Sequence, residues 1–281
     1  MLADVAGLLA CPVCGASFSL AAAVLRCGNG HSFDVARQGY VNLMPGGARP
    51  GTADTAGMVS DRAAFLGAGH YAPLASALAG LAAEAVAGDQ APVVLDAGAG
   101  TGYYLAAVLS RLGSGAVGLA LDISARALRR AAQAAPGIGA VAWDTWQPFP
   151  VRSGAVALIL NIFAPRNGPE FRRILRPGGT LLVVIPAPGH LAELGTAAGL
   201  ISVDEHKDDR LAATLGSYFT ATDRQDLSVP LRLTHPDAAR LVAMGPSARH
   251  TNPAGTRARL APLPEPLPVT ASFTLTTYRP R

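Results

Sequence analysis

The stretch Leu95-Asp96-Ala97-Gly98-Ala99-Gly100-Thr101-Gly102 decides the fold class of this 281-residue chain. It joins an apolar run at 93–95, typical of a buried strand, to a helix-like stretch at 103–112. Glycines at such a turn allow unusual backbone angles and let the main chain approach a ligand closely. A glycine-rich turn that ends a strand and opens a helix therefore predicts a nucleotide-like ligand at that strand end.

Further strands and helices alternate on the carboxyl side of this turn, and several strands end at a polar residue. The expected strands are 93–95 before Asp96, 118–121 before Asp122, 141–143 before Asp144, 155–160 before Asn161 and 181–185 before Pro186. The helix-like stretches between them include 103–112, 125–134 and 169–175. This alternation predicts an α/β fold with a mostly parallel sheet. Because ligands bind outside the carboxyl ends of such strands, the four polar residues are expected to line one crevice.

The polar residues around the turn distinguish two cofactor classes. A dinucleotide dehydrogenase carries Gly-x-Gly-x-x-Gly, whereas here an acid, Asp96, precedes the glycines. An acid there would repel a pyrophosphate but suits the ammonium group of S-adenosylmethionine. Asp122, 26 residues after Asp96, suits the two hydroxyls of a ribose. The expected cofactor-binding residues in this region are Asp96, Gly98, Gly100, Thr101, Gly102, Asp122 and, at the adenine amino group, Asp144.

Two tryptophans, Trp143 and Trp146, flank Asp144. Either could stack on the adenine, although core packing is the commoner role of tryptophan.

All three cysteines fall in one N-terminal pattern, Cys-x2-Cys-x12-Cys-x3-His. Its members are Cys11, Cys14, Cys27 and His31. Four thiolate and imidazole ligands at this spacing predict one tetrahedral Zn²⁺. Because four protein ligands leave no open position, the ion is expected to be structural or to support nucleic-acid contact rather than catalysis.

The composition bears on three classes of protein: membrane proteins, disulfide-rich proteins and proteins that bind polyanions. The longest apolar runs fall short of the roughly 18 residues that a membrane helix needs, so we expect no membrane partner. Three cysteines are too few for a disulfide framework, and a reduced, cytoplasmic protein is expected. The formal charge of +4 and pI of about 9.2 allow a polyanionic partner without requiring one.

A series of short motifs follows the cysteine pattern along the chain: Gln38-Gly39-Tyr40-Val41-Asn42-Leu43, Met58, Asp61-Arg62, Phe65-Leu66, Gly69-His70-Tyr71, Asn161-Ile162-Phe163-Ala164-Pro165, Pro186-Ala187-Pro188-Gly189-His190-Leu191 and Leu241-Val242-Ala243-Met244-Gly245-Pro246. In this order the motifs resemble the RlmA-type ribosomal RNA guanine-N1 methyltransferases. The alanine-rich composition, with arginine as nearly all of the positive charge, is most similar to the actinomycete branch that includes the tylosin-resistance methyltransferase. The resemblance covers nearly the whole chain. It implies a class I (Rossmann-like) methyltransferase fold with one zinc ion, and a homodimer.

The same resemblance implies a function. The expected target is N1 of a guanine in a 23S rRNA hairpin near the macrolide-binding exit tunnel, and the resemblance also implies a role in macrolide resistance. By position, the family's cofactor contacts fall on Tyr71, Gly102, Tyr103 and His190. The catalytic base stays open: Asn161 could orient a base edge but cannot remove a proton, and His190 is assigned to the cofactor.

These expectations divide the chain into three parts. Residues 1–45 would be a zinc-binding RNA-recognition module, 46–88 a helical connector that contributes to the cofactor site, and 89–281 the methyltransferase domain. The candidate phosphate contacts are Arg37, Arg49, Arg62, Arg249, Arg257 and Arg259, and the stretch from Arg249 to Arg259 is expected to be an exposed loop.

Two alternatives stay open. A small-molecule methyltransferase of antibiotic biosynthesis would need no zinc knuckle. A zinc-dependent RNA-binding protein with an inactive methyltransferase domain would lack cofactor affinity.

Overall fold

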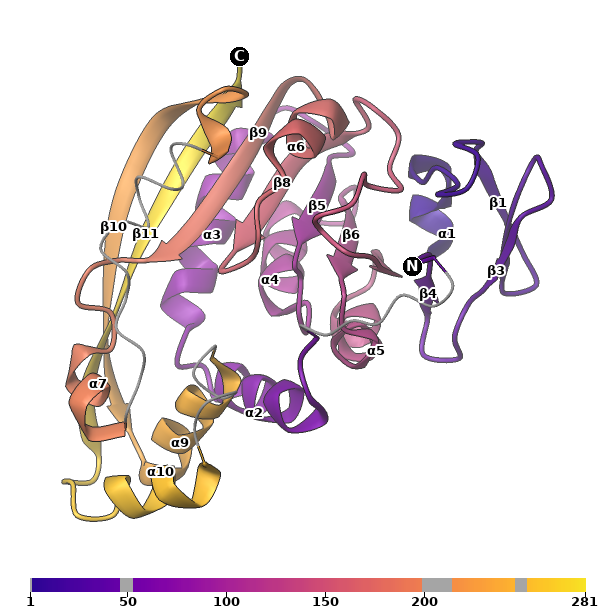
Figure 1. The fold of residues 1–281 in the computed structure, drawn as a ribbon. Helices are drawn as coiled ribbons and strands as arrows, with labels where there is room; N and C mark the ends of the chain where they lie inside the picture. The colour runs from indigo at the N-terminus through magenta and orange to yellow at the C-terminus, as the bar shows by residue number, and fades with distance from the viewer. Residues whose placement is uncertain (1, 46–52, 199–213, 246–251) are drawn as a thin grey trace.

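The computed structural model describes residues 2–45, 53–198, 214–245 and 252–281. These residues form an eight-stranded sheet and a separate three-stranded sheet near the N-terminus (Figure 1). The small sheet contains β1 (Phe18–Ala21), β2 (Val24–Cys27) and β3 (Ser32–Asp34). The large sheet contains β4 (Tyr40–Asn42), β5 (Val93–Ala97), β6 (Val117–Asp122), β7 (Ile138–Ala142), β8 (Val156–Ile162), β9 (Leu175–Pro186), β10 (Phe219–Leu233) and β11 (Leu267–Pro280).

The large sheet has the strand order β10-β11-β9-β8-β5-β6-β7-β4. The strands from β9 to β4 pair in parallel, and β11 and β10 add an antiparallel hairpin at the β9 edge. The prediction of a mostly parallel α/β sheet is confirmed. The hairpin was not expected, because the first half of β10 is largely exposed and carries polar residues rather than an apolar run.

The helices also follow the sequence pattern. The α-helices are α1 (Leu2–Val5), α2 (Ala56–Gly67), α3 (Ala72–Ala85), α4 (Tyr103–Leu112), α5 (Ala125–Ala134), α6 (Gly168–Ile174), α7 (Ala192–Ala198), α9 (His235–Met244) and α10 (Pro253–Leu260), and a 3-10 turn, η1, spans Ala6–Leu8. The bounds of α4 and α5 are those expected. Ser124 fixes the start of α5, because its side chain accepts a hydrogen bond from the backbone N–H of Ala127.

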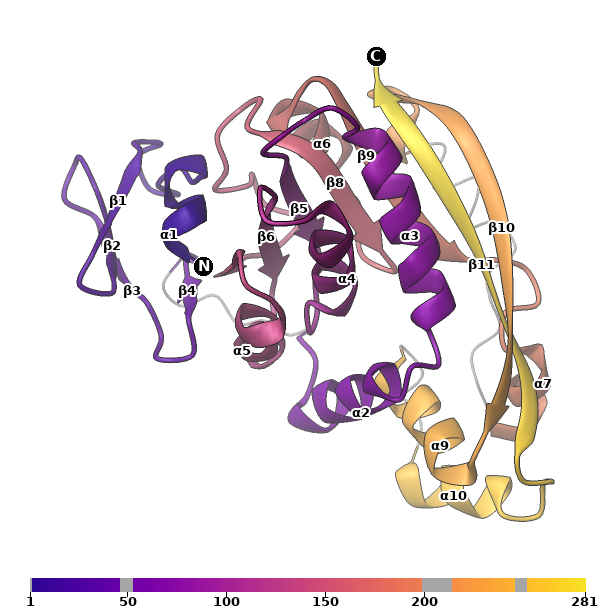
Figure 2. The same ribbon diagram turned by 180° about the vertical axis from the view of Figure 1, so that it is seen from behind.

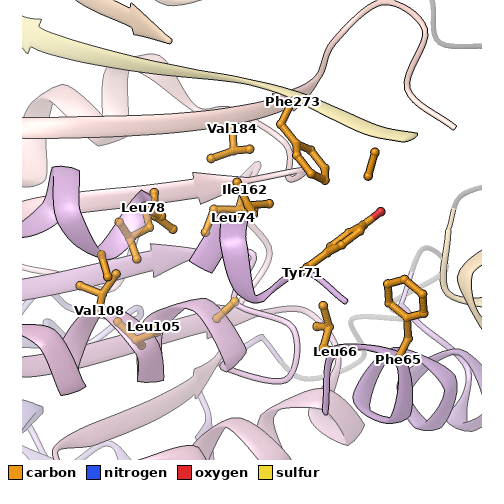
Figure 3. Packing of buried hydrophobic residues seen from close by; sticks show 14 of the residues in the cluster. Phe65, Leu66, Tyr71, Leu74, Leu78, Leu105, Val108, Ile162, Val184 and Phe273 are labelled. Atoms are coloured by element: carbon orange, nitrogen blue, oxygen red, sulfur yellow. The ribbon is translucent and has the colours of Figure 1, made fainter. Parts of the chain in front are cut away.

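Helices cover both faces of the large sheet (Figures 1 and 2). One face packs against α3, α4 and α5, and its core cluster contains Val94, Leu158 and Leu160 of the strands. The same cluster contains Leu78 of α3 and Leu105 of α4 (Figure 3). The neighbouring strand residues belong to a second cluster on the opposite face, which contains Leu95, Ile159, Val5 of α1 and Phe171 of α6. This alternation follows from the two-residue period of a strand, and covering both faces explains why the strands read as continuous apolar runs.

The N-terminal segment is joined to the large sheet by backbone pairing. Strand β4 pairs in parallel with β7, from Tyr40 opposite Ala140 to Asn42 opposite Ala142. Leu9 forms an isolated bridge with Val151. The second core cluster also runs without interruption from Leu2, Leu9 and Leu25 to Trp143 and Phe149. The segment is therefore an integral part of the core.

Among the described residues, no helix is both long and apolar enough to cross a membrane.

Candidate cofactor and metal sites

The glycine turn lies where β5 meets α4 and has little room for side chains. Gly98, Gly100 and Gly102 have φ angles of 88°, 53° and 78°, in the left-handed region that favours glycine. A Cβ atom on Gly98 would lie 2.4 Å from Cβ of Ala164, and one on Gly102 would lie 2.9 Å from Cα of Ala131. The turn therefore needs glycine both for its backbone angles and for its close contacts.

Asp122, at the end of β6, holds this turn in place. Its Oδ2 accepts a hydrogen bond from the N–H of Gly100 at 2.8 Å, and its Oδ1 accepts one from the N–H of Ser124 at 2.7 Å. Burial raises the pKa of Asp122, whereas these two backbone hydrogen bonds lower it. Each carboxylate oxygen keeps a further lone pair, so the group can still accept hydrogen bonds from a ribose.

Asp96, on β5, is buried with 1% of its surface exposed, and its Oδ1 has no hydrogen-bond partner. Burial raises the pKa of Asp96 to about 8, and the nearby charge of Asp122 contributes to the rise. An unpartnered buried carboxylate is costly unless a cation or a donor meets it. The ammonium group of S-adenosylmethionine meets this requirement, so the residues at the turn fit that cofactor.

Asn161 lies at the end of β8, beside the same turn. It is fully buried, and its Nδ2 donates hydrogen bonds to the carbonyls of Ala97 and Pro165, at 3.3 and 2.8 Å. Its Oδ1, by contrast, has no partner. Two adjacent strands, β5 and β8, therefore each bring one unpartnered buried oxygen to the glycine turn.

Asp144 follows β7 and is half-buried. Its Oδ1 accepts a hydrogen bond from the N–H of Trp146 at 3.0 Å. The two flanking tryptophans differ: Trp143 is buried in the core, whereas 65% of Trp146 is exposed. Trp143 thus has the packing role that its residue type favours, and Trp146 alone of the two is open to a ligand.

Three of the expected residues lie in or beside an aromatic cluster. Tyr71 is buried, and its ring makes edge contacts at 5.1 Å with both Phe65 and Phe273 (Figure 3). The ring of His190 lies 4.9 Å from Phe273. Tyr103 opens α4 and lies 5.2 Å from Tyr104, with a pKa raised by burial.

The Nδ1 atom of His190 lies 2.7 Å from the carbonyl oxygen and 3.1 Å from the backbone nitrogen of Ser272. The contact with the carbonyl suits a protonated Nδ1 that donates, and the contact with the N–H suits a bare Nδ1 that accepts. In either tautomer Nδ1 is engaged by the backbone of β11 and is not available as a base.

Arg62 was a candidate phosphate contact, but the structure gives it an internal role. Its Nη1 forms an ion pair with Asp54, and its Nη2 donates a hydrogen bond to the carbonyl of Met244 at 2.8 Å. The same guanidinium lies close to Gly100, since a Cβ there would be 3.6 Å from Nη1. Arg62 therefore ties α2 to the end of α9 beside the glycine turn, and its two engaged nitrogens argue against a phosphate-binding role.

The other arginine candidates differ in what can be said of them. Arg37, Arg257 and Arg259 have exposed side chains, whereas Arg49 and Arg249 lie outside the described residues. The prediction of a loop up to Arg259 was wrong from Pro253 onward, because residues 253–260 form α10. Asn252 caps this helix and Pro253 occupies its first turn, where proline is tolerated. Both arginines of α10 lie in its last turn.

The four predicted zinc ligands lie together. The ligand atoms of Cys11, Cys14, Cys27 and His31 all lie within 4.8 Å of one another. Sγ of Cys14 is 3.7 Å from Sγ of Cys27. Nδ1 of His31 is 3.7 Å from Sγ of Cys11 and 3.4 Å from Sγ of Cys27.

These separations fit a tetrahedral metal site. Two sulfurs at about 2.3 Å from a tetrahedral zinc are about 3.8 Å apart, which is much longer than a disulfide bond. A backbone hydrogen bond from Ala16 lowers the pKa of Cys14 to about 6 and so favours the thiolate that binds metal. The predicted Cys₃His zinc site is confirmed.

Sequence reasoning missed Phe163 and Phe273 as parts of the site. Phe273 is fully buried on β11, a strand that had not been predicted, and its ring neighbours Tyr71, His190 and Phe163 come from three distant segments. Phe163 lies in the motif that follows the fourth expected strand. Its place two residues after Asn161, at a strand end, was the one signal available.

Comparison with known proteins gives concordant results. The family model for the N-terminal zinc ribbon of RlmA matches residues 9–49. A Streptomyces fradiae protein, 23S rRNA (guanine(748)-N(1))-methyltransferase, is 50% identical over 282 residues, covering 100% of this chain and 99% of the relative. A Micromonospora griseorubida protein named as a 23S rRNA (guanine-N(1)-)-methyltransferase is 51% identical over 288 residues, covering 97% of each chain.

A Bacillus subtilis (strain 168) protein named for the same reaction is 33% identical over 190 residues, covering 66% of each chain. The full-length matches at about half identity, the zinc ribbon and the glycine turn agree with one another. The chain therefore belongs to the RlmA-type family of S-adenosylmethionine-dependent 23S rRNA guanine-N1 methyltransferases.

Proposed function

We propose that this protein transfers a methyl group from S-adenosylmethionine to N1 of a guanine in a hairpin of 23S rRNA near the macrolide-binding exit tunnel. The observation that carries the proposal is the pair of unpartnered buried oxygens, Oδ1 of Asp96 and Oδ1 of Asn161, at the glycine turn. Once ionised, Asp96 needs a cationic partner, and the amide oxygen of Asn161 needs a hydrogen-bond donor. The full-length relative from Streptomyces fradiae, named for guanine 748, supports the choice of substrate.

The polar residues at the strand ends divide the binding of the cofactor between them. When bound, S-adenosylmethionine supplies an electrophilic methyl group on a sulfonium. We assign Asp96 to its amino group, Asp122 to the ribose hydroxyls and Asp144 to the adenine amino group. We assign the main chain of the glycine turn to close contact with the cofactor, at Gly98, Gly100, Thr101 and Gly102. Tyr71, Tyr103 and His190 are further cofactor contacts that the family resemblance implies.

The acceptor must lose a proton, because N1 of guanine carries hydrogen at neutral pH. Asn161 can accept a hydrogen bond from the Watson–Crick edge of guanine through its unpartnered Oδ1, and so orient N1 toward the methyl group. An amide cannot remove the proton. We therefore assign Asn161 to positioning, which can itself supply much of a rate enhancement.

The RNA-binding surface is assigned to the N-terminal segment and the C-terminal helices. Residues 1–45 are proposed as the RNA-recognition module, 46–88 as the connector and 89–281 as the methyltransferase domain. Arg37 and the α10 residues Arg257 and Arg259 are the proposed phosphate contacts. Because N1 lies on the pairing edge of the base, the guanine must leave its stack, and a hairpin loop makes this inexpensive. The family resemblance further leads us to propose a cytoplasmic homodimer and a role in macrolide resistance.

The direct test is methyl transfer from labelled cofactor to a 23S hairpin transcript, with the modified base mapped by mass spectrometry. A matched hairpin carrying 1-methylguanosine at the target should take up no label there. Asp122→Ala serves as the protein control and should lose activity through weaker cofactor binding. Label on a macrolide, with none on RNA, would instead establish the small-molecule methyltransferase as the function.

A further inference from the structure

Phe163 stands out at the end of β8. Its φ angle is 54°, in the left-handed region that bulky residues rarely adopt, and 42% of its surface is exposed. Such a conformation persists only where the surroundings hold it, and it is commonest at functional sites. Three large hydrophobic side chains are exposed among the described residues, and Phe163 is the one beside the glycine turn.

The backbone on both sides of Phe163 is fixed against the cofactor crevice. Its own N–H donates a hydrogen bond to the carbonyl of Val184 at 3.1 Å. The next residue, Ala164, fills the space above Gly98, where a Cβ would be only 2.4 Å away. Two residues earlier, Asn161 is bonded to the carbonyl of Ala97. The segment that carries Phe163 therefore packs directly on the turn.

Other aromatic rings support the ring of Phe163 from the protein side. The ring centroid of Phe273 lies 5.7 Å from that of Phe163, with 43° between the ring planes. The ring centroid of Tyr104 lies 6.4 Å from that of Phe163, with 71° between the planes. Phe273 is buried, and burial also raises the pKa of Tyr104. The ring of Phe163 is thus backed by fixed rings, while part of its own surface faces solvent.

The strand order indicates which ligand this surface meets. Asp122 and Asp144, assigned to the ribose and the adenine, lie at the ends of β6 and β7, on one side of β5. Phe163 lies at the end of β8, on the other side of β5 and close to Asn161. The adenosine half of the cofactor is therefore directed away from Phe163, which leaves the acceptor as its partner.

We infer that Phe163 is the stacking platform for the target guanine, with its exposed ring against one face of the unstacked base. This inference rests on the proposed function. Stacking on an aromatic ring holds any base, so the ring would supply position while Oδ1 of Asn161 reads the Watson–Crick edge. The strained backbone would serve to turn the ring outward from a strand end that is otherwise buried.

The decisive variant is Phe163→Gly, because glycine adopts this φ angle readily and the loss of the ring should not impair folding. We expect kcat/KM for the hairpin to fall by about 10- to 100-fold. The Kd for S-adenosylmethionine should change by less than about twofold. The Tm should fall only modestly, because relief of the left-handed backbone strain offsets part of the ring packing that is lost. Phe163→Leu, which keeps apolar bulk without a ring, should behave like the glycine variant, and Phe163→Tyr should restore most of the activity.

A second measurement isolates the contact with the base. Phe163→Gly should weaken binding of the intact hairpin but not of a hairpin that is abasic at the target, since the two changes remove the same interaction. Equal weakening on both hairpins, a parallel loss of cofactor affinity, or full activity of Phe163→Leu would overturn the assignment. If the wild-type protein methylates no 23S hairpin, the proposed function fails and the assignment fails with it. If the wild-type protein methylates the hairpin but the Phe163 variants do not show the expected losses, the stacking assignment fails and the proposed function stands.

Discussion

Without cofactor, the free energy of unfolding of Asp96→Asn should rise relative to that of the wild type as the pH rises. The same substitution should abolish cofactor binding. The change keeps the size and shape of the side chain but removes its charge. Asp96 is buried, its Oδ1 has no partner, and its pKa in the folded protein is about 8, against an ordinary value of 3.8. Between these two values the folded protein therefore holds a proton on Asp96 that the unfolded chain has lost.

The size of the effect follows from proton linkage. Relative to Asp96→Asn, the stability of the wild type is highest below the ordinary pKa of an aspartate. It falls as the pH rises toward the folded pKa, by about 1.4 kcal/mol per pH unit. From about pH 5 to about pH 8 the difference between the two proteins should change by roughly 3–4 kcal/mol, and it should level off above that. This change does not depend on how well asparagine packs, since packing affects both ends of the pH range equally.

The assay is urea unfolding of both proteins across this pH range, followed by the same series with S-adenosylmethionine. Cofactor at about one hundred times its Kd should stabilise the wild type by about 2.7 kcal/mol, whereas Asp96→Asn should gain almost nothing. A stability difference that stays constant with pH would show that Asp96 is not a buried acid of raised pKa. Equal stabilisation of both proteins by cofactor would refute its assignment to the amino group.

Three further outcomes are expected. Asp122→Ala should weaken S-adenosylmethionine binding by at least about 1–3 kcal/mol in calorimetry, because it leaves the ribose hydroxyls unpaired and also releases the N–H of Gly100 in the glycine turn. Unchanged affinity would contradict the assigned place of Asp122. Cys14→Ser should lose the single zinc in metal analysis and lower the Tm, because Cys11 and Cys27 belong to the second core cluster; retained zinc would contradict the ligand set. The double variant Arg257→Ala, Arg259→Ala should reduce the slope of log K for RNA binding against log salt concentration by about 0.7 for each phosphate that is no longer neutralised. Cofactor binding should not change. An unchanged slope would exclude α10 from the RNA surface.

The parts of the fold that could be predicted are those encoded within short stretches of sequence. The run from Leu95 to Gly102 carries both a strand end and its glycine turn, and Ser124 marks the start of α5, so β5, α4 and α5 could be predicted closely. The zinc ligands could be predicted because Cys₃His spacing is itself a local pattern.

The parts that could not be predicted depend on contacts between distant residues. Phe273 joins the site only because β11 pairs with β9. The alternation of apolar and polar residues from Leu267 to Leu275 is typical of a strand, but it does not show which strand is the partner. Arg62 resembled a surface cation until the fold brought it to Asp54 and to the carbonyl of Met244, 182 residues away. Phe163 looked like an ordinary motif residue, because its φ angle and exposure cannot be read from residue type.

The pairing of β4 with β7 covers an edge of the large sheet that could otherwise pair with other chains. All five residues of β7 are buried, from Ile138 to Ala142, and β4 supplies its outer neighbour. An apolar strand whose edge is uncovered is a template for pairing with other chains. If loss of zinc loosens the N-terminal segment, the apolar edge of β7 is uncovered, and we expect the zinc-free protein to aggregate more readily than the zinc-bound protein.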